Sequence, residues 1–577
     1  TLYTNGDEMR RESAMDVLSK LAEFSINALT PHCKDVHDLL ITALQDVSIN
    51  VRVAALQASI GFIMSIDDDL KMKCKDMIPY IFQVLSQTFE MKNDELMKEC
   101  MLDLMDICSI EFNFIRESIS PITSVLLSIA KANHILEIDT CRVAFEFLVT
   151  LTKVGQGSIR ALSNVISQII ELSFTFMLSL KHIDHDWNTN TEDDYDVADF
   201  YIDYDAIERI SYNIGEKLML KYTFPMINQL IQGNSMQERH AALSALSQMA
   251  GACKKSLPLK DILPTLINLI NTDKHPRVQY AAIHCIAMFS NECKPYIQQH
   301  YVDYIIPTLL SQMQSYTSSL RVSGHAALAM VDYLSGVDED MEESVYSYVD
   351  DLLNAALNLL KLDSILVQEN ALACIASVST LCHEKFANYY DIFMPILKQI
   401  LHTPSNGNDN LNKTKARAIE CLGKIVLAVG KDKFISDAEE MVSFLLSTKQ
   451  SIETNESNSS NGDDTRPLAI AQCLCCIAQT LGEDFSSALS SIIPNLLNLA
   501  SQADKTCFIT DQGEKTGYEG QNGYTSENVN LRFIGDKQVT VNNTLQQEVN
   551  NAIRSIGIYA ENCPLGYGPY LKDTFKL

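Results

Sequence analysis

The sequence predicts an all-α fold, an α-solenoid in which helical hairpins stack into a superhelix. The first observation is the stretch "HPRVQYAAIHCIAMFS", which places Val278, Ala282, Cys285 and Ile286 on one face of a helix. A small residue in the middle of that face lets a neighbouring helix approach closely. The second observation is that the same face returns along the chain, as in repeat proteins.

Copies of this face centre on alanines, which from Ala242 onward are 40, 44, 45 and 47 residues apart. This interval is typical of paired-helix solenoids rather than of propellers or leucine-rich repeats. One such hairpin is unable to bury its apolar face alone, so we expect roughly a dozen of them to stack. The alanines are Ala55, Ala242, Ala282, Ala326, Ala371 and Ala418.

A second apolar helix, with a proline inside it, accompanies these copies. Proline removes a backbone donor and kinks a helix, so its recurrence predicts a bent outer helix around a straighter inner one. In the turn between the two helices, Asp46 and Asp273 are suited to cap the inner helix. These features are typical of HEAT repeats, whose long concave surface wraps elongated partners and offers no natural pocket for a small molecule. The prolines are Pro79, Pro121, Pro264, Pro307, Pro395 and Pro494.

Three segments interrupt the array. We expect HEAT repeats over 1–180, 207–446 and 466–500 and a partial repeat over 545–577, separated by an acidic insertion at 181–206, a polar flexible loop at 447–465 and an insertion at 501–544. The last insertion contains "NLRFIGDKQVTV", two alternating runs about Gly535 and Asp536 that predict a small β-hairpin.

The acidic insertion has two interpretations. A run of charge is usually a solvated loop, but it is also suited to bind a basic surface. It contains the only tryptophan, Trp187, which suggests that the loop has a place to dock. His182 and His185 stand nearby, but without cysteines or a second-shell pattern we expect no metal site there.

Composition excludes several classes of function. The net charge of −28 repels a phosphate backbone, so we expect basic partners and no direct binding to nucleic acid. No apolar stretch is long enough to predict a membrane span. The 16 cysteines are interpreted as buried, reduced thiols of a nuclear or cytosolic protein. Gly155 and Gly430 lie in loops that lack complete nucleotide-binding motifs, so we predict a protein that is not an enzyme and holds no cofactor.

Four stretches carry a family resemblance: "MQERHAALSALSQMAGACKK", "DKHPRVQYAA", "HEKFANYYDIFMPILKQIL" and "RAIECLGKIVLAVGKDKFISDA". They resemble the importin-β superfamily of nuclear transport receptors, in particular its importin-5 (karyopherin beta-3) branch. The acidic loop and the helix "AIERISYNIGEKLML" after it are similar to the same branch. Members of the family are longer at both ends, so we expect a fragment that lacks the N-terminal repeats and the C-terminal arch.

This resemblance implies a monomeric import receptor that shuttles between cytoplasm and nucleus. It would carry basic cargo with lysine-rich localisation signals, contact FG-repeat nucleoporins and release cargo when Ran-GTP binds. We expect cargo to meet the concave side at Asp332, Glu369 and Glu420, with His284 and Ser377 nearby. For the loop, the hypothesis is that a basic patch on Ran binds Asp186, Trp187, Asp193, Asp194 and Asp196.

Two other functions stay open. One is a HEAT scaffold that holds enzymes together, although the varied repeat length, the acidic loop and the late hairpin argue against it. The other is a chaperone of basic proteins, which only its insensitivity to Ran would separate from an import receptor.

Overall fold

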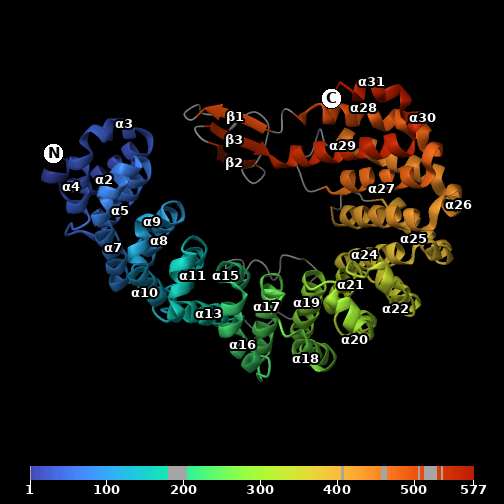
Figure 1. The fold of residues 1–577 in the computed structure, drawn as a ribbon, viewed down its shortest axis with the longest axis horizontal. Coiled ribbons are helices and arrows are strands. Elements are labelled where there is room, and N and C mark those ends of the chain that lie inside the picture. Colours follow the sequence, from blue (N-terminus) through green and yellow to red (C-terminus); the bar gives the residue numbers. More distant parts are fainter. Residues whose placement is uncertain are drawn as a thin grey trace. The chain divides into compact units, whose positions relative to one another are not determined.

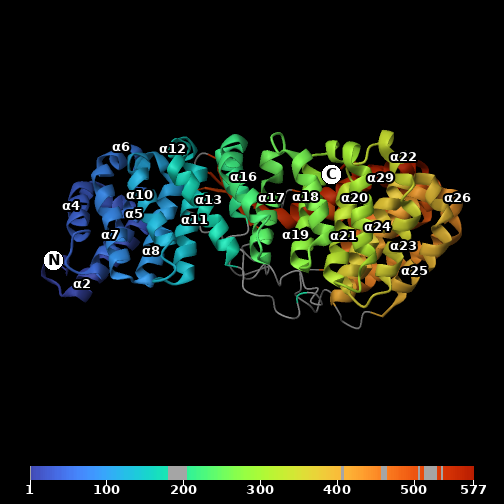
Figure 2. The same ribbon diagram turned by 90° about the horizontal axis from the view of Figure 1, so that it is seen from below.

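The structure, a computed structural model, describes residues 2–179, 187, 205–404, 409–455, 464–503, 507–511, 529–534 and 537–576. The chain divides into two compact units, Thr1–Ile297 and Gln298–Leu577. Within each unit, consecutive inner helices pack side by side and an outer helix precedes most of them (Figure 1, Figure 2). The predicted α-solenoid is therefore confirmed.

In the first unit, each inner helix packs against the next inner helix along the chain. The inner helices are α2 (Glu8–Phe24), α5 (Ile49–Ser65), α8 (Asp94–Ile110), α11 (Ile138–Val154), α15 (Ala206–Ile214), α17 (Met236–Cys253) and α19 (Pro276–Glu292). The outer helices are α4 (Cys33–Ala43), α7 (Ile78–Met91), α10 (Ile119–Ala130), α13 (Ser163–Leu178), α16 (Glu216–Leu230) and α18 (Leu259–Thr272). Short helices connect them: α1 (Leu2–Asn5), α3 (Ile26–Leu29), α6 (Asp68–Lys71), α9 (Phe112–Ile115) and α12 (Gln156–Ala161).

The second unit continues the alternation. Its inner helices are α21 (Leu320–Leu334), α24 (Ile365–Cys382), the first part of α26 (Asp409–Asn455), α27 (Arg466–Leu481) and α29 (Asn543–Asn562). Its outer helices are α20 (Tyr296–Gln314), which begins just before the unit boundary, α23 (Val349–Leu360), α25 (Tyr390–His402), the second part of α26 and α28 (Leu489–Ala500). Short helices α22 (Glu342–Tyr346), α30 (Pro564–Tyr567) and α31 (Leu571–Thr574) complete it.

The predicted apolar faces form the core. All six repeat alanines have no exposed surface, and Val278, Cys285 and Ile286 are equally buried. Because a methyl group is all that stands at each alanine, successive inner helices approach closely there. Helix α24 is long and apolar enough to cross a membrane by length and composition, but ten of its residues are buried and it packs between α21 and α26.

The turn aspartates act differently from the prediction. Asp46 accepts the backbone N–H of Ser48 at 2.9 Å, and Asp273 accepts that of His275 at 2.9 Å, so each binds the N-cap residue rather than the first helical turn. Arg11 and Arg239, one repeat earlier, each bind their aspartate through two guanidinium nitrogens. The aspartate therefore ties two inner helices together, and its side chain is almost fully buried in both cases.

The prolines are inside the outer helices at Pro264, Pro307, Pro395 and Pro494, as predicted. A break in helical geometry is recorded in only one of these four helices, and it does not lie at the proline. In α20 the backbone leaves helical geometry at Tyr301, six residues before Pro307. The proline ring clashes with the carbonyl four residues earlier, that of Asp303, so the break lies beyond the direct reach of the proline. At Pro79 the preceding residues form a 3₁₀ turn, so the proline stands in the first turn of α7.

The polar loop predicted at 447–465 is partly wrong, because α26 stays helical to Asn455. Ile452 is buried, and the hydroxyls of Ser447 and Ser451 donate to carbonyls three or four residues earlier. The buried Ile452 anchors this last part of the helix, and the serine hydroxyls find hydrogen-bond partners within it. Residues 456–463 lie outside the described part of the chain.

The predicted hairpin is confirmed and is larger than expected. Strands β2 (Val529–Ile534) and β3 (Lys537–Asn542) pair antiparallel, with Arg532 opposite Val539. A third strand, β1 (Cys507–Asp511), pairs with the other edge of β3 and gives the order β1-β3-β2. Gly535 and Asp536 lie outside the described residues.

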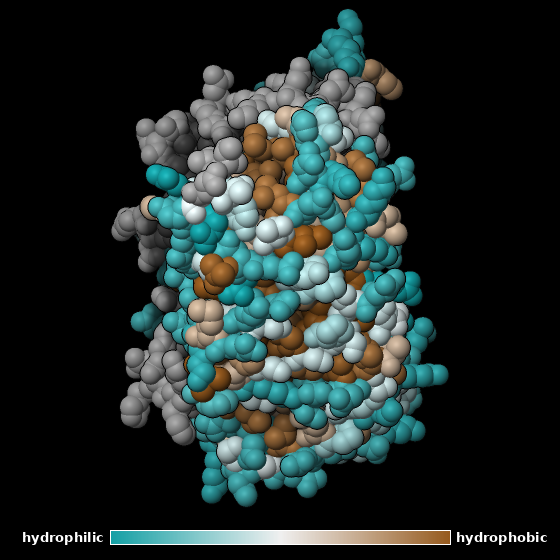
Figure 3. All heavy atoms as spheres, turned by 90° about the vertical axis from the view of Figure 1, so that its left-hand side faces the viewer, coloured by the Kyte–Doolittle hydropathy of each residue, from teal (hydrophilic) through white to brown (hydrophobic). Residues whose placement is uncertain are grey.

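Outside strand β1, the cysteines of the described residues are thiols, and all of these except Cys33 and Cys476 are buried. Burial raises the pKa of most of these thiols, for example that of Cys74 to about 11, so they stay protonated at neutral pH. At the N-terminal end of the first unit, apolar atoms are exposed among polar ones (Figure 3). On α2 the exposed apolar side chains are Met9, Val17, Leu21 and Phe24.

Candidate binding surface on the inner helices

The inner helices α21, α24 and α26 present partly exposed side chains opposite their buried alanines. Positions two residues before, two after and six after the central alanine are four apart, so they lie on one face of the helix. Glu369, Ser377, Asp332 and Glu420 occupy such positions in α24, α21 and α26. All four are partly exposed while the alanines between them are buried. The structure therefore places these four predicted residues on one exposed stripe of three successive, packed inner helices.

The stripe carries positive as well as negative charge. In α26, Arg417 Nη1 lies 2.9 Å from Glu420 Oε2, and both side chains are well exposed. Such a surface pair contributes about 0–1 kcal/mol, so Glu420 is able to exchange this partner for a lysine of a ligand. Lys424 stands one turn after Glu420 and is exposed. The sequence prediction overlooked both basic residues.

His284 belongs to the first unit, unlike the other four predicted residues. It stands two residues after Ala282, on the corresponding face of α19, and is half-buried. Burial lowers the pKa of His284, so the imidazole is neutral at pH 7. It offers hydrogen bonds rather than charge.

Helix α8 contributes acidic residues that the sequence prediction missed. Glu99, Asp103 and Asp106 are spaced four and three apart and so share one face. Gln57 of α5 donates to Glu99 at 2.7 Å. Burial, reinforced by the charges of Glu99 and Asp106, raises the pKa of Asp103 to about 6. The spacing of these acidic residues could have predicted their shared face from the sequence. The helix was not recognised because its core holds Cys100 and Met101 and it lacks the central alanine.

Trp187 confirms that the acidic insertion has a docking place. Its indole is 1% exposed, stands edge-on to the ring of Tyr280 at 5.6 Å and has the guanidinium of Arg277 5.3 Å from its centre. Tyr280 is two residues before Ala282, so the indole covers the stripe of α19. Asp186, Asp193, Asp194 and Asp196, together with His182 and His185, lie outside the described residues. The described residues contain no group of three or more metal-ligating side chains.

Four family descriptions match successive parts of the chain. Residues 2–125 match "IPO5-like, TPR repeats" and residues 133–221 match "Importin repeat". Residues 236–289 match "HEAT-like repeat", and residues 325–512 match "Importin subunit beta-1-like, TPR repeats".

Similar proteins point the same way. Importin subunit beta-3 of Saccharomyces cerevisiae is 26% identical over 590 residues, which covers 99% of this chain and 51% of the relative. Kap121p bound to Pho4p superposes with a TM-score of 0.81 at 24% identity, covering 99% of this chain and 53% of that chain. Kap121p bound to Nup53p gives a TM-score of 0.82, also at 24% identity, with the same coverage. The chain thus spans about half the length of the relatives it matches.

Proposed function

The chain is built of importin-β-family repeats along most of its length, and from that premise we propose that it is the cargo-binding part of a nuclear import receptor. The observation that carries the proposal is the stripe of Asp332, Glu369, Ser377 and Glu420 on three successive inner helices. Lysine side chains of a localisation signal pair with the carboxylates of Asp332, Glu369 and Glu420. Each exposed pair adds about 0.2–1 kcal/mol, so several together are needed for useful affinity.

The proposal includes the partners that complete a transport cycle. Ran-GTP binds the acidic insertion through Asp186, Asp193, Asp194 and Asp196 and releases cargo, while FG-repeat nucleoporins bind elsewhere on the solenoid. The complexes of Kap121p with Pho4p and with Nup53p support the binding of a protein partner by this fold, and the role of Ran-GTP rests on the family resemblance alone. Shuttling between cytoplasm and nucleus follows from the same role, and no enzymatic activity is proposed.

The test is anisotropy of a fluorescent lysine-rich localisation peptide. The double variant Asp332→Lys, Glu420→Lys should weaken binding roughly tenfold, because two attractions become repulsions worth together about 1.4 kcal/mol. The matched control is Asp432→Lys, Glu439→Lys, which makes the same change in net charge at exposed residues of the outer part of α26. It should change affinity less than twofold.

Equal weakening by both double variants would mean that only the general negative charge attracts the peptide, and it would exclude the stripe as the site. Adding Ran-GTP to the wild-type complex separates the candidate functions. Displacement of the peptide supports an import receptor, whereas a complex that is indifferent to Ran-GTP supports a scaffold or a chaperone of basic proteins.

A further inference from the structure

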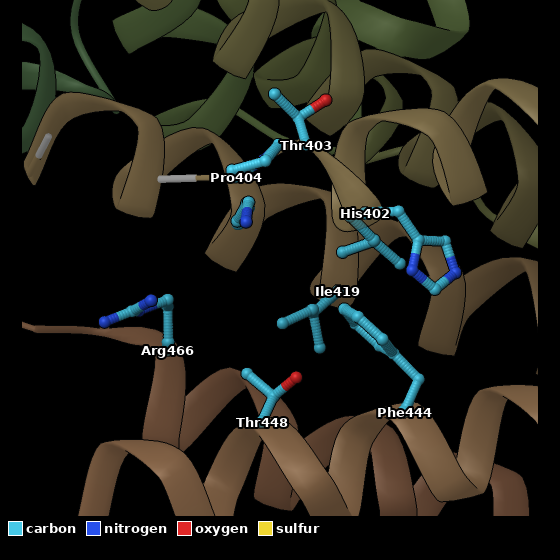
Figure 4. Close-up of a pocket in the computed structure, with 9 residues that line it drawn as sticks. His402, Thr403, Pro404, Ile419, Phe444, Thr448 and Arg466 are labelled. Atoms are coloured by element: carbon cyan, nitrogen blue, oxygen red, sulfur yellow. The ribbon is translucent and has the colours of Figure 1, made fainter. Parts of the chain in front are cut away.

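A cavity of about 190 Å³ lies within the second unit, where four helical segments meet. The end of α25 supplies His402, and the segment after it supplies Thr403 and Pro404 (Figure 4). The two parts of α26 and the first residue of α27 complete the wall. Sequence reasoning expected no pocket in a solenoid, and this one forms because residues far apart in the chain converge.

One wall of the cavity carries two basic side chains, Lys415 and Arg466, of which Arg466 already pairs with a carboxylate. Arg466 is held by Asp464, whose carboxylate accepts its Nε at 2.9 Å and its Nη2 at 2.5 Å. Lys415 is partly buried, and no acidic side chain among the described residues pairs with it. Burial, together with the charge of Arg466, lowers the pKa of Lys415. Among the described residues no carboxylate offsets this charge, and an anion bound in the cavity would do so.

The other wall is apolar and well ordered by packing. Ile419 and Leu401 are 1% exposed, and the rings of Phe444 and His402 meet edge-on with centres 4.6 Å apart. Glu440 lies 3.8 Å from His402, so this histidine already has an acidic neighbour and adds little to the cationic wall. Figure 4 shows Ile419 and Phe444 side by side, facing Arg466 across the cavity.

We propose that this cavity binds an anionic side chain of a partner peptide, with its charged group beside Lys415 and Arg466 and its stem against Ile419 and Phe444. Charge-assisted hydrogen bonds favour a carboxylate or a phosphate there. A cavity of 150 Å³ is known to hold one benzene ring, so this one fits a single side chain rather than a peptide backbone. The site is separate from the acidic stripe proposed for basic cargo, and it would read an acidic or phosphorylated residue of a partner.

The experiment is a ligand-observed NMR titration of the whole chain with phenyl phosphate, phenylacetate and inorganic phosphate. We expect saturable, millimolar binding of the two aromatic anions, with inorganic phosphate weaker because it lacks the stem. Benzylamine, which has the same ring and the opposite charge, should not bind. If phenyl phosphate binds at least tenfold tighter than phenylacetate, the natural group is a phosphorylated residue; otherwise it is an Asp or Glu carboxylate.

Lys415→Met removes the charge and keeps the stem, so it should weaken binding of the aromatic anions at least tenfold. The matched control is Lys413→Met, an exposed lysine two residues earlier on the same helix, which should leave binding unchanged. Thr448→Phe, which fills the cavity without changing its charge, should abolish binding. This variant tests the proposal if Lys415→Met does not fold. No saturable binding to the wild-type chain, or equal loss in both lysine variants, would overturn the proposal.

Discussion

At the scale of single residues, Trp187 belongs to the acidic insertion but packs against a helix of the repeat array. One buried indole fixes a point of an acidic segment on the stripe of α19, where Tyr280 and Arg277 contact it. Burying an aromatic ring of this size favours the docked position of Trp187 by several kcal/mol.

Because Trp187 is the only tryptophan, its fluorescence reports this contact directly. We expect blue-shifted emission that acrylamide quenches poorly. Tyr280→Ala should shift the emission to the red and increase quenching, because it removes one wall of the site. Tyr304→Ala, which changes an exposed tyrosine in the second unit, is the control and should leave the spectrum unchanged. Emission of a water-exposed indole in the wild-type chain would contradict the docked position.

Asp103 makes stability depend on pH. Its pKa rises from 3.8 to about 6 on folding, so the folded state binds its proton more tightly than the unfolded state. The native chain therefore loses stability as pH rises from about 4 to about 6, and the loss persists at pH 7. Asp103→Asn should raise the free energy of unfolding at pH 7 by about 1 kcal/mol, discounted for partial exposure to solvent, and should have no effect below pH 4.

Urea unfolding at pH 4 and pH 7 measures this difference. The control is Asp16→Asn, an exposed aspartate within α2, which should change stability little at either pH. An Asp103→Asn variant that is destabilised at pH 7 would mean that the carboxylate makes a favourable contact in its ionised form.

At the scale of elements, the hydrophobic periodicity of the sequence predicts where the helices lie, whereas individual residues determine where they end. The six inner helices with a central alanine were found because that alanine recurs, and α8 was missed because a cysteine and a methionine fill its core. Helix α26 extends eight residues beyond Ser447, into a stretch whose composition suggested a loop. Composition is a weak guide there, because one buried isoleucine decides the outcome.

Gly430 separates the inner and outer parts of α26 with a φ of 74° and no intervening loop. With ψ at 179°, this backbone conformation is essentially restricted to glycine, and a side chain there costs about 1–3 kcal/mol, so Gly430→Ala should destabilise the chain by that amount. Gly557, inside α29, has open space around it and no positive φ. Gly557→Ala should instead stabilise by up to about 1 kcal/mol through helix propensity. Thermal unfolding of both variants tests the contrast, and a neutral Gly430→Ala would mean that the turn tolerates a different backbone.

For the molecule as a whole, the net charge of −28 governs how fast basic partners arrive. Raising the salt from 0.1 to 1 M shortens the Debye length from about 10 Å to about 3 Å, so association of a lysine-rich peptide should slow steeply. In stopped-flow measurements at fixed salt, the outer variant Asp432→Lys, Glu439→Lys should lower only the association rate. The inner variant Asp332→Lys, Glu420→Lys should also raise the dissociation rate, because it changes contacts in the complex. An inner variant that alters association alone would argue against direct contact.

The sequence by itself determined the α-solenoid, the family resemblance and the repeat alanines. These features appear in the sequence as a 3.6-residue periodicity and as a regular interval between repeats. They can therefore be inferred without knowing which distant residues are in contact. Only the tertiary structure decided that Trp187 docks on α19, that Asp103 has a pKa of about 6 and that Lys415 and Arg466 share a cavity. Each of these depends on which residues from separate helices meet and how far packing excludes water between them, and neither quantity is periodic along the chain.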